Sequence, residues 1–297
     1  MAVRPLVTVD WGTSSLRGAR LADDGTVLEE RSFARGILSV PAGGFPAVFN
    51  ECFGDWMAAP DALCLIAGMA GSRQGWVEAP YCACPTGLAG VASRLAWVQA
   101  GRIAIVPGLS CEHGGVPDVM RGEETQVLGA LQLLGLTGGT LVLPGTHSKW
   151  VQVQAGRIVD FATLMTGEFY ALLRQHSILS RTLPATDGEL HGEAFDAGVA
   201  HARSSPGLLQ SAFSVRTLAL FERLPEPQRL SYLSGVVIGE ELRSRPLAAT
   251  DRVVVIGAEA LTQRYARALA QCGVRVDIIG SQAAWRGLRE IAKELSA

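Results

Sequence analysis

One polar stretch near the start of the chain decides the expected fold: Asp10-Trp11-Gly12-Thr13-Ser14-Ser15-Leu16-Arg17. It follows an apolar strand over 6–9 and precedes a second strand over 16–21. An acid at a strand end, then a turn of glycine and hydroxyl residues, gathers N–H groups, hydroxyls and a carboxylate in one concavity. The N–H groups and hydroxyls suit phosphate oxygens, the carboxylate suits hydrated magnesium, and Arg17 can add a bidentate phosphate contact. The same residues also fit an ordinary β-hairpin with a solvated acid.

A second turn of related composition is Pro144-Gly145-Thr146-His147-Ser148-Lys149. It lies between expected strands over 141–143 and 150–153, so Gly145 and Thr146 predict a second phosphate contact facing the first across a cleft. It is not a Walker A loop, because the sequence has no Gly-Lys pair and a strand follows where that motif needs a helix. Lys149 either reaches phosphate or is an ordinary surface charge.

The two turns open two halves of similar pattern. Each half begins with an apolar strand, a Gly-Thr turn, a strand, a glycine turn and a third strand, which is a weak internal repeat. Strands alternate with helices in both halves, so the class is α/β. We predict an N-terminal domain over 1–137 and a C-terminal domain over 138–297. The charged stretch 182–206, which contains glycine and proline, is expected to be an insertion or a mobile segment.

A third candidate contact follows the apolar strand over 253–256, at Gly257 and Ala258. Glycine there lets a flat ligand such as adenine approach closely, and the N-terminus of the following helix offers free N–H groups. Such junctions are common in α/β folds, so this one carries little weight by itself.

Glu123 and Glu124 begin an expected helix over 122–134. Acids in a first helical turn are ordinary, because they complement the helix dipole. A carboxylate at a helix start inside an interdomain cleft is also well placed to accept a proton from an attacking hydroxyl. Both interpretations stay open, as does the choice between the two acids.

The loop over 71–81 mixes arginine, glutamine, glutamate and aromatic residues, and three of its residues suit a sugar acid. Arg73 suits a carboxylate, Ser72 suits a hydroxyl, and Trp76 suits an apolar face of the ligand. The alternative is a loop anchored by buried aromatics. Glu168, in Thr166-Gly167-Glu168-Phe169, follows the third strand of the second half and is expected to face the same cleft.

Composition and charge argue against several other classes of protein. The 297 residues carry 26 basic and 28 acidic side chains, a net charge of −2, which argues against nucleic acid as a partner. No apolar run is long enough to span a membrane, and the N-terminus reaches an acid too soon for a signal peptide. Six scattered cysteines favour a reducing, cytoplasmic setting. Cys82 and Cys84 look like half a metal site, but no pair at zinc spacing completes it, so we expect ordinary thiols.

Together the three turns resemble the actin/hexokinase/heat-shock-protein superfamily of ATP-dependent phosphotransferases. Residues 10–17 are similar to its first phosphate motif in the sugar-kinase form, Asp-x-Gly-Thr-x-Ser-x-Arg. Gly145-Thr146 resembles the second phosphate motif, and Gly257-Ala258 the adenosine motif. The resemblance implies an α/β fold of two ribonuclease-H-like domains, of the actin/hexokinase ATPase type, flanking a nucleotide cleft.

Five stretches are similar to one family, the 2-dehydro-3-deoxygalactonokinases, and the similarity runs from about residue 5 to residue 290. They are Val9-Asp-Trp-Gly-Thr-Ser-Ser-Leu-Arg17, Met69-Ala-Gly-Ser-Arg-Gln-Gly-Trp76, Met120-Arg-Gly-Glu-Glu-Thr-Gln126, Leu143-Pro-Gly-Thr-His-Ser-Lys-Trp150 and Met165-Thr-Gly-Glu168. The resemblance implies ATP-dependent phosphorylation of 2-dehydro-3-deoxy-D-galactonate at its 6-hydroxyl, in galactonate catabolism. It also places Glu123 and Glu124 where hexokinases have a catalytic aspartate and exopolyphosphatases a catalytic glutamate.

The resemblance implies the following site. Magnesium would be held by Asp10, the proton would pass to Glu123 or Glu124, and the sugar acid would contact Ser72, Arg73, Trp76 and Glu168. ATP would contact Gly12, Thr13, Ser14, Arg17, Gly145, Thr146, Lys149, Gly257 and Ala258.

Two departures from the superfamily pattern stand out. Pro144 replaces an acid, which leaves metal binding mainly to Asp10, and Ala258 replaces a usual glycine of the adenosine motif. Two other functions compete with the kinase: a phosphohydrolase of the same fold acting on nucleotide or polyphosphate, and a non-catalytic nucleotide-binding regulator. A hydrolase would consume nucleotide without any sugar acid. The sequence predicts neither the oligomeric state nor the stereoisomer of the sugar acid.

Overall fold

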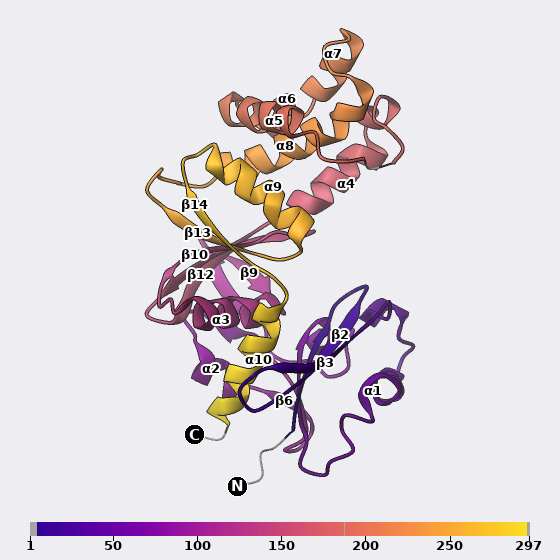
Figure 1. The fold of residues 1–297 in the computed structure, drawn as a ribbon, viewed down its shortest axis with the longest axis vertical. Helices are drawn as coiled ribbons and strands as arrows, with labels where there is room; N and C mark the ends of the chain where they lie inside the picture. The colour runs from indigo at the N-terminus through magenta and orange to yellow at the C-terminus, as the bar shows by residue number, and fades with distance from the viewer. Residues whose placement is uncertain (1–4, 187, 296–297) are drawn as a thin grey trace. The chain divides into compact units, whose positions relative to one another are not determined.

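The computed structural model describes residues 5–186 and 188–295 (Figure 1). By packing, these residues form two compact units, each described here by itself. The first contains the described residues of 1–141, 150–162 and 279–297, and the second contains 142–149 and 163–278. The units are defined by packing, whereas the predicted division between 137 and 138 rests on a repeated strand pattern, so that division stays a prediction.

The first unit is built on a six-stranded sheet of order β3-β2-β1-β4-β7-β6. β1 pairs antiparallel with β2 and parallel with β4, so that Trp11 at the end of β1 lies opposite Gly68 at the end of β4. The strands expected over 6–9 and 16–21 are therefore confirmed. The sheet strands are β1 (Leu6–Trp11), β2 (Leu16–Leu21), β3 (Val27–Phe33), β4 (Leu63–Gly68), β6 (Ala96–Gln99) and β7 (Ile103–Ile105).

Aromatic packing fixes the strand end that carries the first turn. Trp11 is fully buried, and its ring lies 5.3 Å from the ring of Phe45 in helix α1 (Phe45–Phe53) and 6.2 Å from that of Trp76. Its indole N–H donates to the carbonyl of Arg35, 3.0 Å away. Edge-on aromatic pairs of this kind stabilise a core beyond the area they bury. The packing of Trp11 therefore fixes the strand end from which the turn begins.

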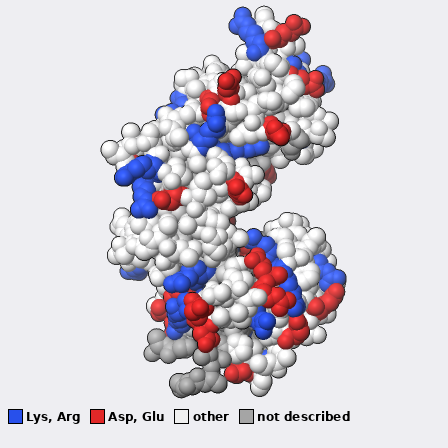
Figure 2. All heavy atoms as spheres, in the orientation of Figure 1, with Lys and Arg blue, Asp and Glu red and all other residues white. Residues whose placement is uncertain are grey.

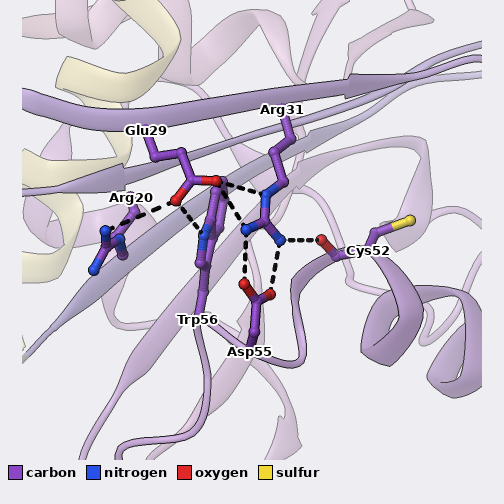
Figure 3. Close-up of polar contacts among 6 residues, drawn as sticks. All are labelled: Arg20, Glu29, Arg31, Cys52, Asp55 and Trp56. Atoms are coloured by element: carbon purple, nitrogen blue, oxygen red, sulfur yellow. Dashed lines mark hydrogen bonds and ion pairs between the residues drawn. The ribbon is translucent and has the colours of Figure 1, made fainter.

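An ion-pair cluster ties α1 to the outer strand of this sheet (Figure 3). Arg31 of β3 donates two hydrogen bonds of 2.7 Å to Asp55, just after α1, and one of 2.9 Å to Glu29. The guanidinium also lies 4.3 Å from the ring centre of Trp56, whose indole N–H donates to Glu29. One planar cation satisfies two carboxylates and an aromatic face here, which a lysine could not do.

Two glycines let the last helix, α10 (Gln282–Glu294), pack directly on α3 (Glu123–Leu134) within the first unit. A Cβ at Gly129 would overlap the carbonyl of Ala283, and a Cβ at Gly287 would overlap the carbonyl of Thr125. The two backbones therefore touch, and any side chain at either position would separate them. The C-terminal helix holds in place the helix that begins with Glu123.

A five-stranded sheet has the order β12-β11-β10-β13-β14, and a three-stranded sheet the order β5-β8-β9. The first contains β10 (Gly139–Leu143), β11 (Ser148–Gln154), β12 (Arg157–Leu164), β13 (Arg252–Ile256) and β14 (Arg275–Ile279). The second contains β5 (Cys82–Ala83), β8 (Leu109–His113) and β9 (Val116–Met120). The short helix α2 (Leu88–Ala92) follows β5. The alternation of strands and helices confirms the α/β class.

The second unit is rich in helices. They are α4 (Thr166–His176), α5 (Gly192–Ser204), α6 (Leu208–Ser211), α7 (Ser214–Leu220), α8 (Arg229–Arg243) and α9 (Glu259–Ala270). Within the stretch 182–206, the expectation of a mobile segment is wrong for Gly192–Ser204, a helix that buries Phe195 and Val199, while the expectation of an insertion stays a prediction. A Cβ at Gly198 would overlap the carbonyl of Tyr232, so this glycine serves close helix packing and not a loop. None of the described helices is long and apolar enough to cross a membrane.

Candidate active site

Backbone hydrogen bonds hold the first Gly-Thr turn in place, while its side chains are exposed to solvent. The N–H of Gly12 donates to the carbonyl of Ser15 at 2.9 Å, and the N–H of Ile37 donates to the carbonyl of Gly12 at 3.0 Å. A Cβ at Gly36 would overlap the backbone of Thr13. Thr13 and the two serines after it are exposed. The turn therefore keeps a fixed backbone while its hydroxyls face solvent, as a phosphate contact requires.

Asp10 and Arg17 are cross-strand neighbours and form an ion pair of 2.5 Å. The Asp10 side chain is 17% exposed and that of Arg17 is 34% exposed, so a ligand can reach both. A divalent cation at Asp10 would compete with the guanidinium for one carboxylate oxygen. The pair fits a site in which Arg17 turns from Asp10 to a phosphate when metal and nucleotide arrive.

The end of β1, the end of β4 and the start of α3 lie side by side in the first unit. A Cβ at Gly68 would lie 3.2 Å from Asp10 Oδ1 and 2.8 Å from the carbonyl of Trp11. A Cβ at Gly122 would in turn lie 3.2 Å from the Cα of Gly68. Both glycines have positive φ angles, +91° and +106°, where other residues are strained. These glycines bring the carboxylate of Asp10 and the glutamates of α3 into one neighbourhood.

The two glutamates of α3 have different surroundings. Glu123 is partly exposed, and its Oε2 accepts a hydrogen bond of 2.9 Å from the N–H of Arg121. Glu124 is fully buried; its Oε2 accepts from the N–H of Gly122 at 2.7 Å, while its Oε1 has no hydrogen-bond partner among the described residues. Burial, reinforced by the charge of Glu123, raises the pKa of Glu124 to about 8. At neutral pH Glu124 is therefore mostly protonated.

The predicted sugar-acid residues occupy different environments. The Arg73 side chain is 89% exposed and pairs with Glu78 at 3.2 Å. Trp76 packs on the core, 5.4 Å from the ring of Phe49, which is the anchoring role that we kept as the alternative. The Ser72 hydroxyl is buried and finds no hydrogen-bond partner in the described part of the chain.

Arg121 is a residue of this region that the sequence analysis did not single out. Its guanidinium lies 4.4 Å from the ring centre of Tyr81 and donates to the carbonyl of Ala79 at 2.8 Å. Its Nε and Nη1 are buried without a hydrogen-bond partner among the residues described, and Nη1 would lie 2.7 Å from a Cβ at Gly71. An arginine beside two glutamates looks like an ordinary surface charge in sequence, so nothing there revealed it.

The start of α4 packs against the second Gly-Thr turn. A Cβ at Gly167 would overlap the carbonyl of Gly145 and lie 2.8 Å from the Cα of Thr146. The N–H of Glu168 donates to the carbonyl of Thr146 at 3.0 Å, and its carboxylate lies 2.6 Å from Nε2 of His147. Glu168 is thus part of the frame of this turn.

Lys149 is 6% exposed, and its ammonium donates to the Thr163 hydroxyl at 2.7 Å. Interpreting it as a surface charge is therefore wrong. Ser148, Trp150 and Val151 beside it on β11 are buried as well, and a buried ammonium needs hydrogen-bond acceptors.

A cavity of about 300 Å³ opens beside this turn in the second unit. Three groups of residues line it: the turn and the start of α4, one face of α8, and one face of α9. They are Gly145, Thr146, Thr166, Gly167, Tyr170, Ser234, Val237, Ile238, Leu261, Arg264 and Tyr265. An apolar slot with a few polar groups is typical of a site for a flat organic ligand such as a nucleobase with its sugar. Gly257 is not among the lining residues; a Cβ there would lie 3.8 Å from the carbonyl of Pro144, the residue before Gly145.

Sequence reasoning found Gly145 and Thr146 of this cavity but missed the residues of α8 and α9 that line it. The wall residues of α8 and α9 recur three and four positions apart, at 234, 237 and 238 and at 261, 264 and 265. That spacing marks one helix face, and it is the signal that could have found them. It does not say whether the face meets a ligand or another helix.

A buried hydrogen-bond network supports the cavity. Glu241, 2% exposed, accepts hydrogen bonds from Thr166 and, at 2.7 Å, from the hydroxyl of Tyr265. That hydroxyl also lies 2.8 Å from the hydroxyl of Ser148. Burial first, and then the carboxylate of Glu241, raise the pKa of Tyr265 well above its usual range. The network joins β11, α4, α8 and α9, so it sets the shape of the cavity.

The fold has relatives among solved structures of low identity. Component A of (R)-2-hydroxyglutaryl-CoA dehydratase from Acidaminococcus fermentans aligns with a TM-score of 0.55 at 14% identity, over 99% of this chain and all of that one. The activator of 2-hydroxyisocaproyl-CoA dehydratase from Clostridium difficile, solved with ADPNP, aligns with a TM-score of 0.53 at 13% identity, over 98% and 96%. The fold with its Gly-Thr turns is the actin/hexokinase-type ATPase fold.

The chain belongs to the 2-keto-3-deoxy-galactonokinase family, whose profile matches residues 10–291, and it is a sugar-acid kinase by that membership. It is 35% identical to the 2-dehydro-3-deoxygalactonokinase of Escherichia coli (strain K12), over 96% of this chain and 97% of that one. It is 37% identical to the probable 2-dehydro-3-deoxygalactonokinase of Rhizobium meliloti (strain 1021), over 97% and 96%. A crystal structure assigned to such a kinase from Sinorhizobium meliloti aligns with a TM-score of 0.90 at 35% identity, over 98% and 99%.

Proposed function

We propose that this kinase transfers the terminal phosphoryl group of ATP to the 6-hydroxyl of 2-dehydro-3-deoxy-D-galactonate, in galactonate catabolism. The observation that carries this proposal is the neighbourhood of Asp10, Gly68 and the start of α3, within a chain that matches the family over residues 10–291. It supplies a carboxylate for a metal and a carboxylate for a proton next to an open hydroxyl-bearing turn.

The residues that would contact the ATP phosphates are Gly12, Thr13, Ser14, Arg17, Gly145, Thr146 and Lys149. The ammonium of Lys149 would have to leave the Thr163 hydroxyl to do so. The adenosine would enter the cavity between α8 and α9, next to Gly257 and Ala258. Arg264 supports this assignment, because its guanidinium lines the cavity and donates to the Ser234 hydroxyl at 3.0 Å, which holds it there.

Asp10 fits a magnesium ion, because it is a reachable carboxylate beside hydroxyls, and magnesium is usually held by one or two carboxylates, phosphate oxygens and waters. Pro144 offers no second carboxylate. The ion would neutralise charge on the transferred phosphoryl group.

We propose Glu123 as the proton acceptor. It is partly exposed at the start of α3, whereas Glu124 is fully buried and mostly protonated at neutral pH. In the reaction the substrate oxygen forms a bond to the γ-phosphorus, the bond from that phosphorus to the β,γ-bridging oxygen breaks, and ADP leaves. The hydroxyl proton passes to Glu123. Such transfer depends on positioning and charge stabilisation, so a fixed helix start suits the role.

The sugar acid would lie against the loop over 71–81. Arg73, freed from Glu78, would hold its carboxylate, and Ser72 and Glu168 would hold its hydroxyls. Trp76 would support the loop from the core. The buried nitrogens of Arg121 lie next to Gly71, so Arg121 would add positive charge beneath the substrate.

A coupled assay of ADP release over a panel of 2-keto-3-deoxy sugar acids tests this function. We expect ADP release with the galactonate derivative, far less with its gluconate epimer, and almost none without a sugar acid. Nucleotide or polyphosphate consumption without sugar acid would contradict the kinase and indicate a phosphohydrolase. Nucleotide binding with no turnover on any member of the panel would contradict catalysis.

We also propose a cytoplasmic location and no nucleic-acid partner. All six cysteines are free, as expected in a reducing compartment. Figure 2 shows Lys and Arg interspersed with Asp and Glu on the face drawn, which is unlike the single-sign surface that binds a phosphate backbone.

A further inference from the structure

A thiol, an imidazole and a carboxylate converge in the first compact unit, and none of them belongs to the proposed kinase site. Cys111 and His113 lie on β8, and Asp160 lies on β12. The sulfur, a ring nitrogen and a carboxylate oxygen all lie within 4.8 Å of one another. Within residues 5–186 and 188–295, this is the one group of three or more such side chains close enough to share a metal ion.

The spacing of these atoms suits a tetrahedral metal ion. Sγ of Cys111 lies 3.5 Å from Nε2 of His113, which lies 3.4 Å from Oδ1 of Asp160. Around zinc, bonds of about 2.3 Å to sulfur and about 2.0–2.1 Å to nitrogen and oxygen put neighbouring ligand atoms roughly 3.3–3.6 Å apart. These two distances match this range, and the sulfur and the carboxylate oxygen lie within 4.8 Å of each other.

The arrangement does not suit a nucleophile relay. In a relay, the thiol and the carboxylate would contact opposite nitrogens of the imidazole. Here Cys111 and Asp160 both approach Nε2, and so does the carbonyl of Phe161, at 2.8 Å. The thiol of Cys111 donates to the same carbonyl at 3.2 Å, so it is not placed to pass its proton to the imidazole.

The strands beneath the cluster are held together by other contacts. Cys111 and His113 are two residues apart and share one face of β8. Beside β12, Thr86 exchanges backbone hydrogen bonds of 3.0 and 2.8 Å with Ile158, and Arg157 donates to the carbonyl of Pro85 at 2.5 Å. The side chains of His113 and Asp160 are 45% and 49% exposed, so an ion can enter from solvent.

We propose that Cys111, His113 and Asp160 bind one zinc-class divalent cation, with water as the fourth ligand. Binding releases the thiol proton to solvent and replaces the hydrogen bonds to Phe161. The ion links β8 of the three-stranded sheet to β12, the edge strand of the five-stranded sheet. Its role is structural, and it is separate from the magnesium of the kinase reaction because sulfur and imidazole are poor magnesium ligands.

Cobalt binding to the full chain, stripped with a chelator and free of any affinity tag, tests the proposal. We expect one equivalent of Co²⁺ to give thiolate-to-cobalt absorption in the near ultraviolet and visible bands typical of tetrahedral cobalt, and one equivalent of Zn²⁺ to abolish both. Cys111→Ser, His113→Ala and Asp160→Asn should each weaken Zn²⁺ binding by about 100-fold or more. Cys272→Ser and Glu112→Gln are matched controls, on a thiol of the second unit and on the residue of β8 between Cys111 and His113, and should bind as the parent does.

Circular dichroism and kinase activity of each variant show that it is folded. Thermal unfolding supplies a second readout: Zn²⁺ should raise the midpoint of the parent and of Asp10→Asn but not that of His113→Ala. The proposal is overturned if the parent gives no thiolate band. It is equally overturned if the three ligand variants bind Zn²⁺ as tightly as the controls, which would show a hydrogen-bonded cluster only.

Discussion

The two Gly-Thr turns are similar in sequence, but their surroundings differ. The first follows β1, whose end carries the accessible carboxylate of Asp10 paired with Arg17, and it lies near two glutamates of α3. The second, after β10, has Pro144 in place of an acid, an inward lysine, and a cavity of about 300 Å³ beside it. From this difference we propose that the first turn serves charge and proton transfer, and that the second serves recognition of the shape of a nucleoside.

The largest effect should come from the first region. Glu123→Gln removes the proposed proton acceptor at an almost unchanged volume, so kcat should fall about 10²–10⁴-fold. Glu124→Gln is the matched control, because glutamine resembles the protonated carboxyl that burial favours there, and its kcat should fall less than about tenfold. Steady-state kinetics at pH 7 measure both. The reverse order would identify Glu124 as the acceptor.

Glu124 should also make the free energy of unfolding depend on pH. Its pKa in the folded chain is about 8, against an ordinary 4.5, so its full contribution is present below pH 4.5 and is lost as pH rises to about 8. Across that window the folded state keeps a proton that the unfolded state releases, which costs up to about 1.4 kcal/mol per pH unit. Glu124→Gln should therefore gain stability relative to the parent over pH 4.5–8. Denaturant unfolding at several pH values measures this, and parallel profiles would contradict it.

In the second region, removal of the buried lysine should lower the stability of the folded chain. Lys149→Ala leaves the Thr163 hydroxyl without its ammonium and opens a small void, so the free energy of unfolding should fall by about 1–3 kcal/mol. Lys293, the other lysine of the chain, has a half-exposed side chain that pairs with Glu290 within one helix. Lys293→Ala should therefore cost much less. An equal loss of unfolding free energy in the two variants would contradict a structural role for the buried Lys149.

The smallest effect should come from Gly167, where the start of α4 packs against the second turn. Gly167→Ala places a Cβ against the backbone of Gly145 and displaces the turn, so KM for ATP should rise about tenfold while kcat changes less. Gly188→Ala is the control, because a Cβ there meets open space. An unchanged KM for ATP in Gly167→Ala would remove the second turn from nucleotide binding.

Much of the fold could be predicted because its signals are local. The strands around Asp10, the turns and the apolar strand before Gly257 depend on residues close in sequence, and the structure confirms them. Helix α5 escaped prediction because the stretch 182–206 is charged and contains glycine and proline, whereas in the structure Gly198 lets two helices touch. In sequence Cys82 and Cys84 look like half a metal site, but the side chains that converge are Cys111 and His113 of β8 and, from a distant part of the chain, Asp160 of β12.

The sequence by itself determined the α/β class, the family and the positions of the motifs, because strand periodicity, turn residues and motif spacing are properties of short segments. Only the tertiary structure decided that Glu124 is buried while Glu123 is reachable, that Lys149 points inward, and that Trp76 belongs to the core. It also decided which faces of α8 and α9 line a cavity. Burial, pKa and convergence depend on what surrounds a residue from distant parts of the chain, and no local pattern contains that information.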